Sequence, residues 1–274
     1  DGANVSLWQD SIQPYRSGNP ASTRQLYDVT IVGGGITGVS TALLLQESGK
    51  KCLLLEAANL CFGTTGGTTA HLNTLLDVPY SVISKKFSKE AAKTVANATK
   101  DAIQLIRNHI KQYNIDCGFS GADGYLFARD ERQEDELENI LKASKEAGVV
   151  IDYCDNIPVP CSFTKAVRAS GQAKFHPIPY VYALAQAFEK LGGIIQQDCR
   201  VTGVEENGVL EVETSVDTYK SRNVVYATHI PRGLNFLQLR CVPWRSYAMA
   251  LTLANNGYPL DLSYDMEDPY HYYR

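Results

Sequence analysis

The pattern of hydrophobic and polar positions becomes regular at residue 28, after a stretch rich in proline, glycine and small polar side chains. Residues 28–32 and 52–55 are short apolar runs of the kind that form buried strands. Residues 37–48 between them place apolar side chains at helical spacing, and Gly49 is a natural helix end. Two strands joined by one helix predict a parallel β-α-β unit with a right-handed crossover.

Further helices and strands follow along the chain. Residues 88–113 repeat apolar positions every three or four residues, and residues 130–147 begin with acids and end with lysines, so both stretches predict helices. Pro179 opens another predicted helix, which ends at the glycine pair 192–193. Strands are predicted at 124–128, 194–206, 209–214, 223–227, 242–253 and 264–273, with Asn207-Gly208 as a hairpin turn.

One stretch could be mistaken for a membrane span, because residues 29–46 contain no charged side chain. Four glycines, at positions 33, 34, 35 and 38, lie where a strand would turn into a helix. We therefore expect a strand, a turn and a helix, and no membrane partner.

Composition narrows the function classes. The 274 residues are 44% hydrophobic and 20% charged, which is typical of a globular protein with two domains or one large one. The net charge of −4 provides no basic field to hold nucleic acid. Seven cysteines without a Cys-x-x-Cys pair favour free thiols in the cytoplasm over a disulfide framework, and no metal site is expected.

The motif Gly33-Gly34-Gly35-Ile36-Thr37-Gly38 fits the G-x-G-x-x-G pattern, and it follows a predicted strand and begins a predicted helix. Gly33 permits the tight turn, Gly35 lets a pyrophosphate approach the backbone, and Gly38 lets the helix lie close to the strand. The main-chain N–H groups at the helix start stabilise phosphate charge. Glu56 ends the second strand, where its carboxylate can accept a hydrogen bond from a ribose 2′-hydroxyl. Together these residues predict a dinucleotide site.

The spacing does not decide between a nicotinamide and a flavin dinucleotide. Residues 61–71 are rich in glycine and threonine. Such a loop would bring N–H groups and hydroxyls to a pyrophosphate or a polar ring edge, and a mobile turn is the alternative interpretation.

These residues resemble the FAD-dependent oxidoreductases of the D-amino-acid oxidase, glycine oxidase and sarcosine oxidase type. The resemblance rests on residues 28–38, 54–57, 63–65 and 224–228, although His229 stands where the family's strand ends in glycine. Residues 6–8 and 63–66 are most similar to a bacterial subgroup that often carries a C-terminal Rieske iron-sulfur domain. The sequence itself contains no Cys-x-His or Cys-x-x-His pair, so such a domain would lie outside it.

The resemblance implies an α/β fold, with a Rossmann-like FAD/NAD(P)-binding domain and a second, antiparallel-sheet α+β substrate domain. A lead-in would span 1–24, the FAD-binding domain 25–78 and 160–235, and the substrate domain 79–159 and 236–274, incomplete at its C-terminus. The residues implied to bind FAD are Gly33, Gly34, Gly35, Ile36, Thr37, Gly38, Glu56, Ala57, Thr64, Thr65, Thr69, Ala70, His71, Val201, Ala227 and Thr228.

The reaction implied by the resemblance is oxidation of the C–N bond of a small amine or amino acid, by hydride transfer to the flavin. That chemistry needs no nucleophile or metal from the protein. Tyr270 and Tyr272 are the candidate substrate contacts, because alternate residues of a strand face the same side, and ordinary sheet packing is the alternative. The arginine that amino-acid oxidases use for the substrate carboxylate would lie beyond Arg274. An NAD-dependent dehydrogenase and a non-catalytic dinucleotide-binding module remain alternative functions.

Overall fold

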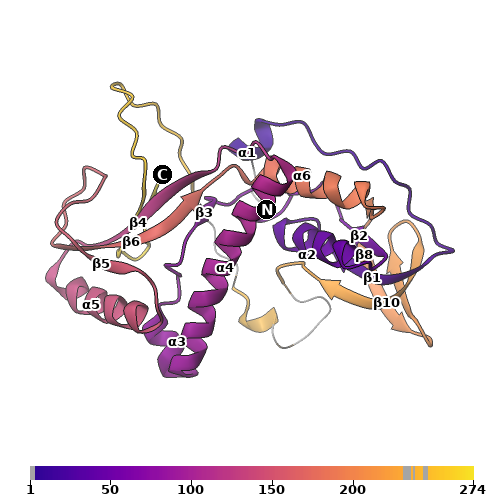
Figure 1. Cartoon of the computed structure of the whole chain (residues 1–274), viewed down its shortest axis with the longest axis horizontal. Coiled ribbons are helices and arrows are strands. Elements are labelled where there is room, and N and C mark those ends of the chain that lie inside the picture. Colours follow the sequence, from indigo (N-terminus) through magenta and orange to yellow (C-terminus); the bar gives the residue numbers. More distant parts are fainter. Residues whose placement is uncertain (1–3, 231–235, 237, 243–245) are drawn as a thin grey trace. The chain divides into compact units, whose positions relative to one another are not determined.

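The computed structural model describes residues 4–230, 236, 238–242 and 246–274 (Figure 1). The chain divides into two compact units, each built from three separate stretches. The first unit comprises Asp1–Thr68, Ile110–Cys117 and His176–Tyr247, and the second comprises Thr69–His109, Gly118–Phe175 and Ala248–Arg274. Relative to the ranges expected from the sequence, residues 69–78 and 160–175 fall in the second unit, and the lead-in and residues 110–117 and 236–247 fall in the first. The last part of the expected FAD-binding range, 231–235, lies outside the described residues.

The first unit contains a six-stranded sheet in the order β7-β2-β1-β10-β9-β8. Its strands are β1 (Leu26–Val32), β2 (Cys52–Leu55), β7 (Ile194–Gln196), β8 (Val201–Glu206), β9 (Leu210–Thr214) and β10 (Thr218–Tyr226). β1 pairs in parallel with β2 and β10, and β2 pairs in parallel with β7, while β8, β9 and β10 are antiparallel. Tyr27 and Ile31 of β1 are fully buried, because the strand has a partner on each side.

The helices of the first unit are α1 (Leu7–Asp10), α2 (Ile36–Glu47), α6 (Pro177–Lys190) and a 3-10 turn at Gln238–Arg240. α2 connects β1 to β2 and packs against both strands and against α6, so the predicted β-α-β unit is confirmed (Figure 1). α6 begins two residues before the predicted Pro179, because the His176 ring accepts a hydrogen bond from the Ile178 N–H and caps the helix.

The second unit contains a sheet in the order β12-β11-β4-β6-β3, with β5 also paired to β6. Its strands are β3 (His71–Leu72), β4 (Ser120–Ala128), β5 (Ile151–Cys154), β6 (Lys165–Lys174), β11 (Leu262–Asp265) and β12 (Tyr272–Tyr273). Pairing is antiparallel except between β4 and β11, which are parallel.

Helices α3 (Tyr80–Lys86), α4 (Lys89–Tyr113) and α5 (Glu131–Glu146) complete the second unit, although α4 passes into the first unit at Ile110. α5 packs against β4, β5, β6 and α3. The side chain of Asp130 caps α5 by accepting a hydrogen bond from the Gln133 N–H at 3.1 Å. The helices predicted at 88–113 and 130–147 are therefore confirmed.

Three strand predictions were wrong in detail. The described part of residues 242–253 forms no strand, and Tyr247, Met249 and Leu251 are exposed, because an alternating pattern needs a neighbouring strand to pair with. Residues 243–245 of that prediction lie outside the described residues. Residues 194–206 form two strands, β7 and β8, and residues 264–273 form the ends of a hairpin, β11 and β12.

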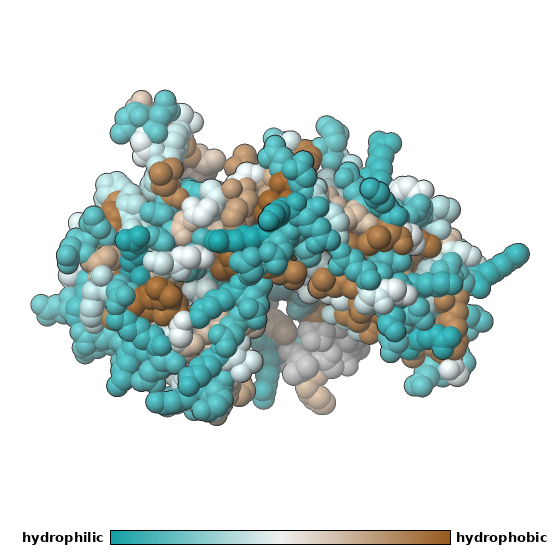
Figure 2. All heavy atoms as spheres, in the orientation of Figure 1, coloured by the Kyte–Doolittle hydropathy of each residue, from teal (hydrophilic) through white to brown (hydrophobic). Residues whose placement is uncertain are grey.

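Among the described residues, no helix combines the length and the apolar composition needed to cross a membrane. On the face shown in Figure 2, hydrophilic side chains cover most of the surface and hydrophobic ones form separate patches. The uncharged run at 29–46 is divided between β1, the glycine turn and α2, and none of the seven cysteines forms a disulfide.

Candidate functional site

Glycines shape the turn between β1 and α2. Gly33 has a φ of +116°, a backbone conformation that favours glycine, and a β-carbon there would lie 2.5 Å from the carbonyl oxygen of Ala227. A β-carbon at Gly38 would lie 1.8 Å from the carbonyl oxygen of Gly33. The first and last glycines of the motif therefore leave no room for a side chain.

Glu56 lies against this turn. It directly follows β2, and its Oε2 accepts a hydrogen bond from the Gly34 N–H at 2.6 Å, while its Oε1 accepts one from the Ala58 N–H at 2.8 Å. Two main-chain donors thus fix the carboxylate at the carboxyl ends of β1 and β2, the edge at which parallel α/β sheets bind ligands. The structure brings Gly34 and Glu56 together, as the spacing predicts.

The start of α2 presents main-chain donors toward the same place. Gly35 is the N-cap residue and provides no side-chain hydrogen bond, and the Ile36 N–H donates to Thr65 Oγ1 at 3.0 Å. A β-carbon at Gly35 would lie 2.9 Å from that hydroxyl oxygen. A helix N-terminus favours a phosphate group. The residues present fit a dinucleotide, because a main-chain cradle that admits no side chain lies beside the Glu56 carboxylate.

Side chains of the lead-in hold the loop 61–68, which carries Thr65. The Trp8 indole N–H donates to the last carbonyl of the loop at 2.7 Å. The Gln9 amide donates to the first two carbonyls at 3.2 and 3.1 Å, and the Ser6 hydroxyl donates to the carbonyl of Gly66. The short helix α1 therefore ties down both ends of this loop.

The other predicted cofactor residues of the first unit are spread more widely. Ala227 follows β10 and its N–H donates to the carbonyl of Val32 at 2.8 Å, which places it beside the glycine turn. The Thr228 hydroxyl donates to the carbonyl of Ile230 at 2.9 Å. Val201 begins β8 and packs its side chain into the core of the sheet, so only its backbone could meet a ligand. Among the other predicted cofactor residues, Thr37 and Thr64 are exposed and Ala57 is half-buried.

Thr69, Ala70 and His71 belong to the second unit, whereas Thr64 and Thr65 belong to the first. The predicted cofactor residues of this loop are therefore divided between the two units. The carbonyls of Thr69 and Ala70 accept hydrogen bonds from the Arg274 guanidinium, which also donates to another carbonyl of the second unit. Arg274 thus fixes the backbone just before His71.

A cluster of one histidine, one asparagine and three tyrosines lies in the second unit. His71 Nδ1 lies 2.9 Å from the Tyr264 hydroxyl oxygen, to which the Asn73 amide donates at 2.7 Å. The Tyr272 ring packs edge-on against the rings of both His71 and Tyr264. The Tyr272 hydroxyl donates to the Tyr270 hydroxyl at 2.8 Å. Tyr270 and Tyr272 do lie together, although Tyr270 precedes β12 instead of sharing a strand face with Tyr272.

Burial sets the protonation of this cluster. Burial is the largest cause, and together with the positive charges of Arg274 and Lys174 it lowers the pKa of His71 from 6.5 to about 4. Burial also raises the pKa values of the Tyr264 and Tyr272 hydroxyls. At neutral pH the cluster is therefore an uncharged set of hydrogen-bond donors and acceptors.

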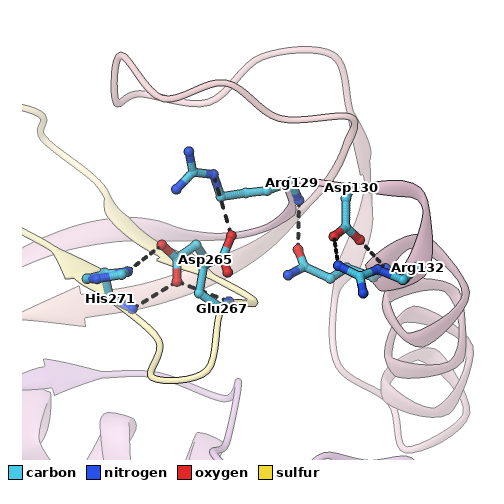
Figure 3. Close-up of polar contacts among 7 residues, drawn as sticks. Arg129, Asp130, Arg132, Asp265, Glu267 and His271 are labelled. Carbon is cyan, nitrogen blue, oxygen red and sulfur yellow. Dashed lines mark hydrogen bonds and ion pairs between the residues drawn. The ribbon is translucent and has the colours of Figure 1, made fainter.

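A second polar group closes the β11–β12 hairpin (Figure 3). The buried carboxylate of Asp265 lies 2.7 Å from His271 Nδ1 and accepts hydrogen bonds from the main-chain N–H groups of His271 and Glu267. Arg129 lies 3.7 Å from the Glu267 carboxylate. These contacts hold the turn that carries Tyr270. An open pocket of about 530 Å³ at this turn is lined by Arg129, Asp130, Glu267, Asp268, Pro269 and His271.

Sequence reasoning missed Asn73, Tyr264 and the buried Asp265. Asn73 lies two residues after His71, and side chains at this spacing in an extended strand face the same side, so the sequence could have indicated their proximity. Tyr264 and Asp265 gave no signal, because their partners depend on how the sheet is assembled. In the part of the chain that the structure describes, no three His, Cys, Asp or Glu side chains are placed to hold a metal ion.

Comparison with protein families decides which dinucleotide belongs to this fold. The family model described as FAD-dependent oxidoreductase matches residues 28–274. The chain belongs to this family. FAD is the dinucleotide of the FAD-dependent oxidoreductases, so the nicotinamide alternative loses its support.

The curated relatives that the chain matches are longer than the chain. The Rieske 2Fe-2S iron-sulfur protein YhfW of Bacillus subtilis is 31% identical over 227 residues, which are 82% of this chain and 45% of YhfW. The gamma-glutamylputrescine oxidoreductase of Escherichia coli is 27% identical over 206 residues, which are 73% of this chain and 48% of that enzyme. The chain spans about half the length of these relatives.

Two solved enzyme structures share the fold. L-amino acid deaminase from Proteus myxofaciens, in complex with anthranilate, superimposes with a TM-score of 0.64 at 20% identity, over 78% of this chain and 48% of that one. Glycine oxidase from Geobacillus kaustophilus superimposes with a TM-score of 0.59 at 17% identity, over 73% of this chain and 55% of that one. The predicted α/β fold class is confirmed.

Proposed function

We propose that this chain forms the cofactor-binding and substrate-binding parts of an FAD-dependent oxidoreductase that oxidises the C–N bond of a small amine or amino acid. The observation that carries the proposal is the meeting of the Glu56 carboxylate, the glycine turn and the start of α2. The names of its relatives support the substrate class, because gamma-glutamylputrescine oxidoreductase, glycine oxidase and L-amino acid deaminase all take amines or amino acids.

In this proposal the first unit holds the cofactor. Those main-chain N–H groups of residues 34–37 that are not bonded to Glu56 or Thr65 bind the pyrophosphate. Glu56 binds the adenosine ribose, and the backbone of Val201 meets the adenine. Ala227 and Thr228 form the second crossing beneath the cofactor. Thr64 and Thr65 line the path toward the flavin ring.

The second unit orients the substrate. When bound, the flavin supplies the acceptor for a hydride from the carbon next to nitrogen. Tyr270 and Tyr272 offer hydroxyls to the substrate, and the uncharged His71 adds no competing positive charge. The aromatic rings around His71 exclude water from this side of the site.

FAD binding tests the cofactor assignment. Gly35→Val would force a branched side chain against Thr65, and Glu56→Lys would place a cation where the ribose acceptor lies. We expect both variants to lose the flavin absorbance that the unmodified protein retains after gel filtration. Gly67→Ala is the matched control, since a β-carbon there meets nothing within 4 Å. Stoichiometric FAD in both site variants would refute the assignment.

Substrate oxidation is tested in the full-length protein. Glycine, sarcosine and D-amino acids are added anaerobically, and bleaching of the flavin absorbance by one of them identifies the substrate class. A protein that binds FAD but is bleached by no amine would instead be a non-catalytic dinucleotide-binding module. A colourless protein that binds NADH would be a nicotinamide-dependent dehydrogenase.

We further propose a C-terminal Rieske domain in the full-length protein and a cytoplasmic location. The identity with YhfW supports the first, and the free cysteines support the second. Iron analysis and the electron paramagnetic resonance spectrum of the reduced full-length protein test for the cluster.

A further inference from the structure

One buried imidazole nitrogen has no hydrogen-bond partner among the described residues. It is Nε2 of His71, at the start of β3. Buried polar atoms in folded proteins are nearly always hydrogen-bonded to protein or to an ordered molecule. The unpartnered Nε2, which lies among tyrosines and an asparagine, therefore points to a ligand that forms a hydrogen bond with it.

The neighbouring hydrogen bonds decide which nitrogen of His71 carries the proton. A phenol has one proton to donate and can accept hydrogen bonds as well. Asn73 donates its amide N–H to the Tyr264 oxygen, so that oxygen is an acceptor on this side. The phenol proton is then available for His71 Nδ1, at 2.9 Å. Nδ1 is therefore the acceptor, and the proton of the neutral ring lies on Nε2.

The surroundings favour an electron-rich partner for that N–H. The positive charges of Lys174 and Arg274 act on His71, and both disfavour a cation beside it. Lys174 donates to the carbonyl of Leu260 at 2.6 Å, which holds its charge in place. The Tyr272 ring is 5.9 Å from the His71 ring and perpendicular to it, which limits rotation of the imidazole. The acceptor that suits this position is a carbonyl or carboxylate oxygen.

We propose that Asn73 and Tyr264 are positioning residues that hold His71 as the Nε2–H tautomer, and that this N–H donates to a carbonyl or carboxylate oxygen of a bound small molecule. The inference rests on the proposed function, because FAD and a carboxylate-bearing substrate are the two sources of such an oxygen. It assigns to His71 a fixed donor role that depends on two residues outside the glycine motif.

The tautomer is tested by nitrogen NMR on the chain labelled with ¹⁵N-histidine. The sequence has five histidines, and the signals of His71 are assigned by their loss in His71→Gln. We expect the proton on Nε2 in the unmodified chain. In Asn73→Asp the new carboxylate accepts the phenol proton, so Tyr264 must accept from His71 and the ring proton moves to Nδ1. Tyr272→Phe is the control, because the Tyr272 hydroxyl bonds to Tyr270 and the ring contact is kept.

Two results would overturn the positioning role. One is a proton on Nδ1 in the unmodified chain, and the other is an unchanged Nε2–H in Asn73→Asp. Tyr264→Phe provides an independent check, since loss of the phenol must remove the hydrogen-bond shift of Nδ1 while leaving the aromatic packing.

The ligand is tested by titrating the same labelled chain with FAD and then with anthranilate. A shift of the His71 Nε2 signal with FAD alone places the acceptor on the cofactor, and a shift only after anthranilate places it on a carboxylate. No shift with either, in a chain whose absorbance shows bound FAD, would overturn the donor role. If FAD does not bind, the proposed function fails and the donor role fails with it, while the Asn73→Asp result still decides the tautomer.

Discussion

The buried imidazole of His71 couples folding to pH. Its pKa is lowered from 6.5 to about 4, so between these values the unfolded chain binds a proton that the folded chain does not. The free energy of unfolding therefore rises with pH across this window. As the pH falls from 6.5 toward 4, we expect this residue to reduce stability by roughly 3 kcal/mol.

Urea denaturation at pH 7 and pH 4.5 measures this effect. His71→Gln keeps a hydrogen-bonding side chain that does not titrate, so the variant should lose roughly 2 kcal/mol less stability than the unmodified chain between the two pH values. Carboxylates contribute equally to both proteins and cancel in the comparison. Equal losses would show that His71 is protonated in the folded chain.

Residues whose identity follows from backbone geometry were the most predictable. The motif glycines could be assigned roles from their spacing, and Gly33 and Gly38 indeed lie where no β-carbon fits. His229, which replaces a family glycine, adopts a φ of +66°, the region that glycine enters freely. Contacts made across the sheet, such as His71 with Tyr264, leave no local pattern and could not be predicted.

At the level of elements, the short helix α1 fixes the loop 61–68 through side-chain hydrogen bonds. Its Trp8 and Gln9 side chains hold the loop that carries Thr65 to the start of α2. We expect the double variant Trp8→Phe and Gln9→Ala to bind FAD about tenfold more weakly, because three hydrogen bonds of about 1 kcal/mol or less no longer fix the loop. Quenching of FAD fluorescence on binding measures the affinity.

Tyr15→Phe is the matched control for this prediction. Tyr15 lies in the same lead-in, but its hydroxyl donates to Glu189 of α6 at 2.5 Å and not to the loop. The control variant should bind FAD as the unmodified chain does, even if its stability falls. Equal loss of affinity in both proteins would mean that the lead-in acts only through general stability.

Elements with strong periodicity were predictable, and those that depend on a partner were not. The helices at 88–113 and 130–147 follow from apolar spacing and terminal charges. Residues 242–253 alternate like a strand, yet their described part pairs with no neighbouring strand. The run at 264–273 is interrupted because the buried Asp265 binds the backbone of His271 and closes a turn. Alternation alone does not reveal either outcome.

At the scale of the whole molecule, β1 joins parts of the chain that are far apart in sequence. It pairs with β2 shortly after it and with β10 more than half the chain away. We expect a chain ending at Ser215, which lacks β10, to lose hydrogen-exchange protection in both β1 and β2. Mass spectrometry of exchanged peptides measures this protection.

A chain ending at Leu260 is the control for this truncation. It retains every strand of the first sheet but lacks β11 and β12, so β1 should stay protected while the amides of β4 exchange faster. Protection of β1 in the chain ending at Ser215 would contradict the dependence on β10.

The division of each unit into three stretches also affects how such a protein can change over generations. A single crossover between two genes at residues 69–247 would cut through both units, and one outside this range would still divide one of them, so neither unit can be exchanged or duplicated as a block. New specificity must instead accumulate in place, through point changes or short insertions in connections such as residues 266–271. The interleaved chain thereby keeps the two units inherited together.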